Sequence, residues 1–201
     1  MIGPWTFGYN DVTLRLMTQD KKEERRQGRH SFTLKNIEGD TRDRLVCNSC
    51  GWIHYENPKI VVGAVCTWDD RVLLCKRAIE PRRGYWTLPA GYLETHETPE
   101  EGAAREAWEE AEAEIAIRNL LAVYSIARIS QVQLIYRAQL VSPDIAAGVE
   151  SEEVGLFSWD DIPHDDLSFP SVHWALAQFL LVKDLDEFAP FSNPEGQTGD
   201  L

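Results

Sequence analysis

The sequence is poor in cysteine and in basic residues, and it contains no long apolar run. Its four cysteines form no pattern typical of a disulfide framework, which favours a reducing compartment and a cytoplasmic location. No apolar run approaches the roughly 18 residues of a membrane span. The first residues also lack a basic segment followed by an apolar one, so we expect neither a membrane protein nor a secretory signal.

The shortage of basic residues leaves a strongly acidic chain. Lys and Arg number 20 against 33 Asp and Glu, a net charge of −13. This balance disfavours nucleic acid and anionic membranes as partners, because both are bound through basic surfaces. A small phosphate compound remains a candidate, since metal ions and a few arginines can reverse the sign of the charge inside one cleft. The 201 residues, 43% of them hydrophobic, fit one globular domain with an appendage.

Changes of composition divide the chain into four segments. Residues 1–30 are polar and predict an arm that is disordered or loosely packed. Residues 31–58 contain the turn CNSCG and predict a small ribbon-like segment. Residues 59–186 alternate apolar strand patterns with two helical ones and predict the main domain. Residues 187–201 are expected to be a flexible tail.

The main domain has the pattern of an α/β protein with helices packed on a mixed sheet. We expect a hairpin over 60–68 and 71–77, further strands over 115–128, 131–141 and 153–159, and a helix over 171–185.

Another helix is predicted from Thr98 to about Glu112. Thr98 suits the N-cap, Pro99 the first helical position, and Glu101 completes a capping box.

Glutamates are concentrated around this second helix. Residues 91–113 contain eight of them, and helical geometry places Glu106, Glu109 and Glu110 on one face. Three carboxylates on one face repel one another unless a cation lies among them. Mg²⁺ or Mn²⁺ suits carboxylate oxygens best, so the pattern predicts a metal site.

The segment 91–113 resembles the Nudix box: Gly, five residues, Glu, seven residues, Arg-Glu, an aliphatic residue, any residue, Glu-Glu, any residue, Gly, an aliphatic residue. The matching positions are Gly91, Glu97, Arg105, Glu106, Ala107, Glu109, Glu110 and Ala113. Glu112 stands where the family has its second Gly, which ends the helix. A left-handed conformation at Glu112 would cost about 1 kcal/mol.

Flanking stretches extend this resemblance to a Nudix subgroup with an N-terminal zinc ribbon, which includes bacterial Nudix hydrolases and plant FAD and ADP-ribose pyrophosphatases. The stretches are NPKIVVGAV, VLLCKRAIEPRRGYWTLPAGYLE and ESEEVGLFSWDDIP. The resemblance implies an α/β/α sandwich with helices on both faces of the sheet. It also implies hydrolysis of a nucleoside diphosphate linked to another group, and it leaves a homodimer as a candidate assembly.

The zinc ribbon is incomplete in this sequence. Four zinc ligands require two CxxC knuckles, and Cys47 and Cys50 supply only one. The upstream knuckle is expected near 25–28, which reads RRQG. Either histidines, for which His30 and His54 are the candidates, complete a Cys₂His₂ site, or the segment is held by packing alone. We favour packing and expect less than one equivalent of zinc.

The resemblance also implies roles for single residues. Glu106, Glu109 and Glu110 become metal ligands, with a backbone carbonyl from the turn at Gly91. Arg105 orients these carboxylates and pairs with the structural residue Glu97.

A further carboxylate, acting as metal ligand or general base, is expected from Glu150, Glu152 or Glu153, and the family register favours Glu153. The catalytic set is then Arg105, Glu109, Glu110 and Glu153.

Substrate contacts are open to several residues. Arg82 and Arg83 either bind phosphate or lie in a solvated loop, and Tyr92 and Tyr124 are candidates for stacking on an adenine or flavin ring. Trp86 is a third candidate for stacking, but core packing is the stronger expectation because it lies in a strand.

Three functions follow from these expectations. The first is metal-dependent cleavage of FAD, ADP-ribose or an NADH-like compound into two monophosphates. A proline typical of many ADP-ribose hydrolases is missing from the region SIARIS after the box. The second is a nucleoside triphosphate pyrophosphohydrolase, and the third is a nucleotide-binding module without catalysis.

Overall fold

The computed structural model describes residues 31–199, so the predicted polar arm, residues 1–30, and His30 lie outside the described residues. The chain divides into two compact units, Met1–Glu56 and Asn57–Leu201, which we describe separately.

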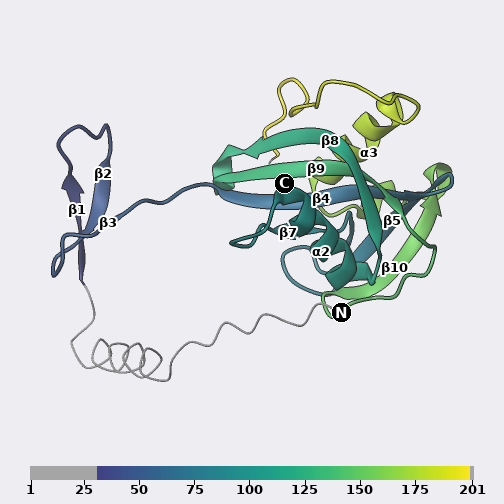
Figure 1. Cartoon of the computed structure of the whole chain (residues 1–201), viewed down its shortest axis with the longest axis horizontal. Helices are drawn as coiled ribbons and strands as arrows, with labels where there is room; N and C mark the ends of the chain where they lie inside the picture. Colours follow the sequence, from purple (N-terminus) through teal and green to yellow (C-terminus); the bar gives the residue numbers. More distant parts are fainter. Residues whose placement is uncertain (1–30, 200–201) are drawn as a thin grey trace, which may run out of the picture. The chain divides into compact units, whose positions relative to one another are not determined.

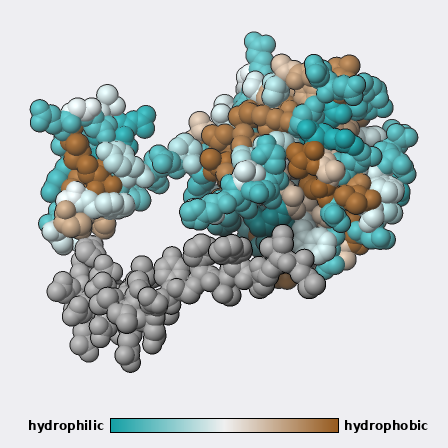
Figure 2. All heavy atoms as spheres, in the orientation of Figure 1, coloured by the Kyte–Doolittle hydropathy of each residue, from teal (hydrophilic) through white to brown (hydrophobic). Residues whose placement is uncertain are grey.

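The smaller unit is a three-stranded antiparallel sheet of β1 (Phe32–Asn36), β2 (Asp43–Cys47) and β3 (Ile53–His54). Figure 2 shows a brown apolar stripe on this unit, and its exposed apolar residues include Leu34 and Leu45.

The CxxC turn connects β2 to β3 in this unit. The Gly51 N–H donates to the carbonyl of Cys47, and the Cys47 N–H donates to the carbonyl of Trp52. The Trp52 ring lies 5.5 Å from the His54 ring, measured between centroids. Cys47 is buried and Cys50 is exposed. Backbone hydrogen bonds and aromatic contacts therefore hold this turn.

The larger unit contains a mixed sheet whose main strands lie in the order β10-β5-β4-β9-β8 (Figure 1). Strands β4 and β9 are parallel, and the other neighbouring pairs are antiparallel. The short strands β6 and β7 pair with β5 and β4. The elements of this unit are β4 (Lys59–Trp68), β5 (Arg71–Arg77), β6 (Trp86–Thr87), β7 (Ala90–Tyr92), α2 (Pro99–Ala111), β8 (Ile115–Ile126), η1 (Ala127–Ile129), β9 (Gln131–Leu140), β10 (Ser151–Ser158), η2 (Trp159–Asp161), η3 (His164–Asp166) and α3 (Pro170–Val182).

Alternation along the buried strands divides the core between the two faces of the sheet. On β5, Leu73 packs with the alanines of α2, and its neighbour Leu74 packs with the apolar residues of α3. The two helices therefore cover opposite faces, which confirms the predicted α/β sandwich. Within the described residues, no helix has the length and apolar character needed to cross a membrane.

Helix α2 begins and ends as the sequence predicts. The Thr98 hydroxyl accepts from the N–H of Glu101, and the Glu101 carboxylate accepts from the N–H of Thr98, so the capping box is confirmed. At the other end Glu112 adopts φ 47° and ψ 29°, in the left-handed region. Its N–H donates to the carbonyl of Trp108, and the N–H of Ala113 donates to the carbonyl of Ala107. The helix therefore ends through the conformation that favours glycine, with glutamate in its place.

The expectation of a flexible tail over residues 187–201 is wrong for its described part. The Phe191 N–H donates to the carbonyl of Leu121, and the Phe191 carbonyl accepts from Val123, so this segment pairs with β8. Phe188 and Phe191 also pack against the core on the α3 side of the sheet. These aromatic anchors supply the burial that a disordered tail lacks.

Candidate active site

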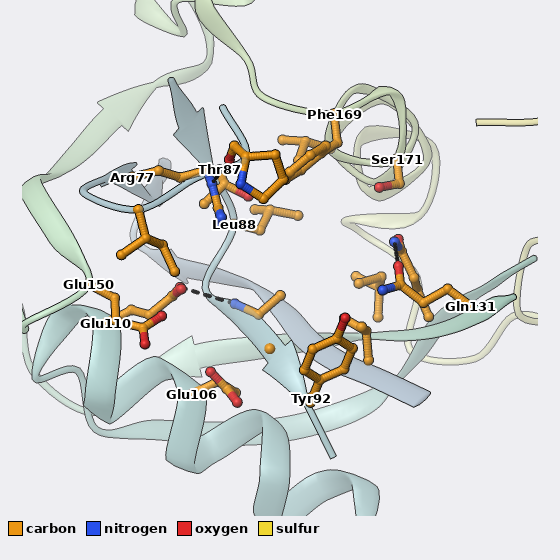
Figure 3. Close-up of a pocket in the computed structure, with 18 of the residues that line it drawn as sticks. Arg77, Thr87, Leu88, Tyr92, Glu106, Glu110, Gln131, Glu150, Phe169 and Ser171 are labelled. Carbon is orange, nitrogen blue, oxygen red and sulfur yellow. Dashed lines mark hydrogen bonds between the residues drawn. The ribbon is translucent and has the colours of Figure 1, made fainter. Parts of the chain in front are cut away.

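A cavity of about 1170 Å³ opens in the larger unit between α2, β7, β9, the start of α3 and the segment before β10 (Figure 3). Seven glutamates line the cavity. Four of them come from α2 and from the segment before β10, namely Glu106, Glu109, Glu110 and Glu150.

Two of the α2 carboxylates are buried against the turn that contains Gly91. Glu106 is 8% exposed and Glu110 is 6% exposed. A Cβ atom at Gly91 would collide with the carboxyl group of Glu106, so only glycine permits this approach. The Glu110 Oε2 atom accepts a hydrogen bond of 3.1 Å from the N–H of Ala90. The turn before α2 therefore positions both carboxylates at the cavity.

Arg105 joins the glutamates of the box into one network. Its guanidinium donates to both carboxylate oxygens of Glu97, at 3.0 and 2.8 Å. Its Nη1 atom donates to Glu106 at 2.8 Å and to Glu109 at 2.9 Å, and its Nη2 atom donates to the Tyr92 carbonyl at 3.0 Å. The hydrogen bonds from Arg105, followed by one from the N–H of Glu94, lower the pKa of Glu97 to about 2.

Burial disfavours the charged forms of Glu106 and Glu110. Desolvation raises the pKa of Glu110 to about 8, and the negative charges of Glu106 and Glu150 contribute. Desolvation also raises the pKa of Glu106, against the lowering effect of Arg105. Buried like charges of this kind are compensated by a cation, and an all-oxygen donor set suits Mg²⁺ or Mn²⁺. The residues present therefore fit a hard divalent cation.

No three His, Cys, Asp or Glu side chains in residues 31–199 are grouped at metal-binding spacing. In the structure Arg105 engages one oxygen each of Glu106 and Glu109. A cation at this site would share these carboxylates with Arg105.

The carboxylate next to β10 differs from the one that the family register favours. Glu153 is 61% exposed at its side chain, lies 3.7 Å from the Lys76 ammonium and is absent from the cavity wall. Glu152 pairs with Arg83 at 2.8 Å. Glu150 lines the cavity and raises the pKa of both buried α2 carboxylates. A bulge between Ser151 and Glu153 shifts the register here, which the sequence pattern does not reveal.

Gly148 explains how Glu150 reaches α2. The Gly148 N–H donates to the Glu110 carbonyl at 3.1 Å, and a Cβ atom at this position would collide with the Glu109 carbonyl. The segment thus docks on the last turn of the helix. In the sequence, the signal for this docking is Gly148, shortly before the acidic run ESEE.

Arg77 is a site residue that the sequence analysis did not identify. It ends β5, lines the cavity, and lowers the pKa of Glu110 through its charge. Its Nε atom donates to the Pro81 carbonyl at 2.8 Å, and its guanidinium carbon lies 5.3 Å from the centre of the Phe169 ring. These contacts hold a cation beside the acidic cluster.

Of the expected substrate-binding residues, only Tyr92 lines the cavity. Tyr124 is fully buried, and its hydroxyl donates to the Gln178 side chain at 2.6 Å, so it lies in the core and away from the cavity. Arg82 lies over the Tyr85 ring in a separate pocket of about 360 Å³.

Arg83 pairs with Glu152 and is also outside the cavity wall. Trp86 is 8% exposed and packs against Phe157, as predicted.

Comparison with known proteins identifies the family of the chain. The NUDIX domain family matches residues 57–182, and the zinc-ribbon family described as Nudix N-terminal matches residues 29–56. The crystal structure of a NUDIX hydrolase from Nitrosomonas europaea is 46% identical, with a TM-score of 0.77 over 83% of this chain and 95% of that one.

Two curated relatives match smaller parts. One, named ADP-ribose pyrophosphatase, from Methanocaldococcus jannaschii, is 29% identical over 54% of this chain and 67% of its own length. Another, named MutT-like protein, from Streptomyces ambofaciens, is 39% identical over 49% of this chain and 60% of its own length. The family match covers more than half of the chain and contains the whole carboxylate network, and the chain therefore belongs to the Nudix family.

Proposed function

We propose that the protein hydrolyses the pyrophosphate bond of a nucleoside diphosphate derivative such as ADP-ribose, FAD or an NADH-like compound, in a metal-dependent reaction that releases two monophosphates. The observation that carries this proposal is the group of Glu106, Glu109, Glu110 and Glu150, with Arg77 and Arg105 beside them, in the wall of a single large cavity. The relative named ADP-ribose pyrophosphatase supports the substrate class.

Glu106, Glu109 and Glu110, with the backbone at Gly91, would hold Mg²⁺ or Mn²⁺. The cation supplies charge neutralisation at the pyrophosphate oxygens and a lowered pKa for the attacking water. Glu150 takes the role that the family register gives to Glu153, as a further ligand or as the general base, because it lies within the cavity.

The remaining polar residues orient these groups. Arg105 holds Glu106 and Glu109 at the cavity and ties them to Glu97, so it acts through the carboxylates. Arg77 contacts the substrate pyrophosphate, since it is a cation fixed beside the acidic cluster.

The size of the cavity favours a substrate with two joined groups. Its volume of about 1170 Å³ exceeds the roughly 300–1,000 Å³ of typical small-molecule sites. A compound with the size of a dinucleotide fits this space better than a simple phosphate ester does.

A second candidate function is pyrophosphate release from nucleoside triphosphates, which the same carboxylates, Glu106, Glu109 and Glu110, would serve. A nucleotide-binding module without catalysis is the third candidate. It would not need a complete set of box glutamates, and Glu106, Glu109 and Glu110 are all present.

Product analysis separates these functions. Purified protein is incubated with Mg²⁺ and ADP-ribose, FAD, NADH or nucleoside triphosphates, and the products are identified by chromatography. We expect two monophosphates from the first three compounds. Pyrophosphate release from triphosphates alone would favour the second function, and no turnover of any compound would favour the third.

The matched variants are Glu110→Gln and Glu153→Gln. The first removes a buried carboxylate of the site and is expected to lower kcat by about 10²-fold or more. The second removes a carboxylate outside the cavity and should leave kcat unchanged. Full activity in Glu110→Gln would contradict the proposed ligand set.

A further inference from the structure

The C-terminal segment that follows α3 returns to the active-site cavity. Gly199, the last residue that the structure describes, lies in the cavity wall, as do Ile126 and Arg128 at the end of β8. Figure 3 shows Gln131 across the cavity from Glu110, and Ile126 pairs with Gln131 between β8 and β9. The segment therefore reaches the end of the cavity that lies opposite the α2 carboxylates.

Two residues hold this segment along β8 (Figure 1). The backbone of Phe191 makes two hydrogen bonds to the strand. The side chain of Asn193 then continues the pairing: its Oδ1 atom accepts from the N–H of Ser125 at 2.8 Å, and its Nδ2 atom donates to the Ser125 carbonyl at 3.0 Å. An asparagine amide thus takes the place of a neighbouring strand and anchors the segment one residue before Ile126.

A tight turn after Asn193 directs the chain towards the cavity. The Gln197 N–H donates to the Pro194 carbonyl at 3.0 Å, and Gly196, the third residue of this turn, has a φ of 74° that glycine permits. The Asn193 Nδ2 atom also donates to the Gln197 carbonyl at 3.1 Å. One side chain therefore holds the strand and the turn together, and its loss should release the chain from residue 194 onward.

Gly199 packs directly on Ile126. Its φ is 79°, and a Cβ atom at this position would collide with the Cδ1 atom of Ile126, so glycine permits both the conformation and the close approach. Ile126 lines the cavity but is only 4% exposed. Displacement of the segment would uncover this side chain and enlarge the cavity at this end.

We infer that residues 193–199 form a selectivity wall, which limits the size of the group that a substrate carries on the far side of its pyrophosphate. This inference rests on the proposed function, which places the pyrophosphate at the α2 carboxylates. A substrate bound there extends across the cavity, and its far group meets Ile126 and Gly199. The wall excludes longer groups by steric conflict, because hydrogen bonds and packing hold it in place.

The test compares ADP-ribose, NADH and FAD, which share an ADP group but carry successively larger second groups. The value of kcat/KM is measured for each compound with Mg²⁺. In the Asn193→Ala variant the ratio of the FAD value to the ADP-ribose value is expected to rise about tenfold, with an intermediate rise for NADH, since steric discrimination by an apolar wall is worth roughly 10–200-fold. The kcat for ADP-ribose should stay unchanged, because the carboxylates lie across the cavity.

Hydrogen exchange shows whether the variant releases the wall. The N–H of Ser125 donates to Asn193, and the N–H of Gln197 lies in the turn that Asn193 closes. Both should exchange faster in Asn193→Ala than in the wild-type protein. Unchanged exchange at both positions would show that Asn193 does not hold the wall, and it would overturn the inference.

Two further variants refine the comparison. Asn193→Asp keeps an acceptor for the Ser125 N–H but loses both donated bonds, so it should raise the ratio by a smaller factor. The control is Asn119→Ala. Asn119 lies on the same strand, outside the cavity wall, and its Nδ2 atom donates to the Asp186 carbonyl at 3.1 Å, near the start of the C-terminal segment. Its replacement should leave the ratio and the exchange at Ser125 unchanged.

An unchanged ratio in Asn193→Ala, although Ser125 exchanges faster, would overturn the selectivity wall, and so would an equal rise in Asn119→Ala. If ADP-ribose is still hydrolysed in either case, the proposed function stands. If the compounds bind without being hydrolysed, the same ratio is taken from calorimetric Kd values and judged in the same way. Absence of both binding and turnover of all three compounds in the wild-type protein would reject the proposed function and the wall together.

Discussion

Glu112 predicts a substitution that stabilises the protein. The residue ends α2 with φ 47° and ψ 29°, where the Cβ atom of an L-residue costs roughly 1–2 kcal/mol. Glycine avoids this cost, but it loses roughly 0.5–1 kcal/mol more conformational entropy on folding than alanine does. The Glu112→Gly variant should therefore have a free energy of unfolding about 0.5–1 kcal/mol higher than that of the Glu112→Ala variant. Comparing the alanine and glycine variants removes the effect of the carboxylate charge.

The matched control is Glu114, two residues further on. It is also exposed, but its φ is not positive, so glycine there brings only the entropic cost. Glu114→Gly should be less stable than Glu114→Ala by about 0.5–1 kcal/mol.

Urea denaturation followed by tryptophan fluorescence measures both pairs, since the chain contains seven tryptophans. One kcal/mol corresponds to a change in Tm of roughly 2–4 °C for a protein of this size. A change from alanine to glycine that shifts the free energy of unfolding in the same direction at both positions would contradict this prediction.

Three further predictions concern the site and its support. Glu150→Gln should lower kcat by about tenfold or more, whereas Glu153→Gln should not, because only Glu150 lines the cavity. The pKa of Glu97 lies at about 2 in the folded protein, below its usual 4.5, so the native state binds fewer protons than the unfolded state between these values. Its stabilising contribution is present above pH 4.5 and lost as the pH falls towards 2, and Glu97→Gln should flatten this part of the dependence of urea midpoint on pH. Tyr124→Phe removes the buried hydrogen bond to Gln178 and should cost about 1–2 kcal/mol of stability with KM unchanged.

Each of these predictions has an outcome that contradicts it. Equal losses of kcat in Glu150→Gln and Glu153→Gln would contradict the assignment of Glu150 as the fourth carboxylate of the site. An unchanged pH slope in Glu97→Gln would show that its pairing with Arg105 does not contribute to stability. A raised KM in Tyr124→Phe would place this residue near the substrate.

Local signals made much of the fold predictable. The hairpin of β4 and β5 follows from two apolar runs around Asp69 and Asp70, and the start of α2 follows from Thr98, Pro99 and Glu101. The carboxylates of α2 were predictable for the same reason, because their common face depends on the geometry of one helix.

The rest of the cavity depends on contacts between distant segments. Arg77, Gln131 and Ser171 come from β5, β9 and α3, and only the parallel pairing of β4 with β9 and the packing of α3 bring them together. Glu150 was one of three candidates, and Glu153 was favoured over it because the sequence does not reveal the bulge at the start of β10. Tyr124 was misassigned because its position in β8 faces the core, which its residue type does not indicate.

If the carboxylates of α2 bind divalent cations, an anomalous difference map from crystals soaked in Mn²⁺ will show the ion at these side chains. The proposal predicts a manganese peak coordinated by oxygens of Glu106, Glu109 and Glu110. A map with no peak at these side chains, while they remain paired with Arg105 or turn to solvent, would contradict the metal-dependent account.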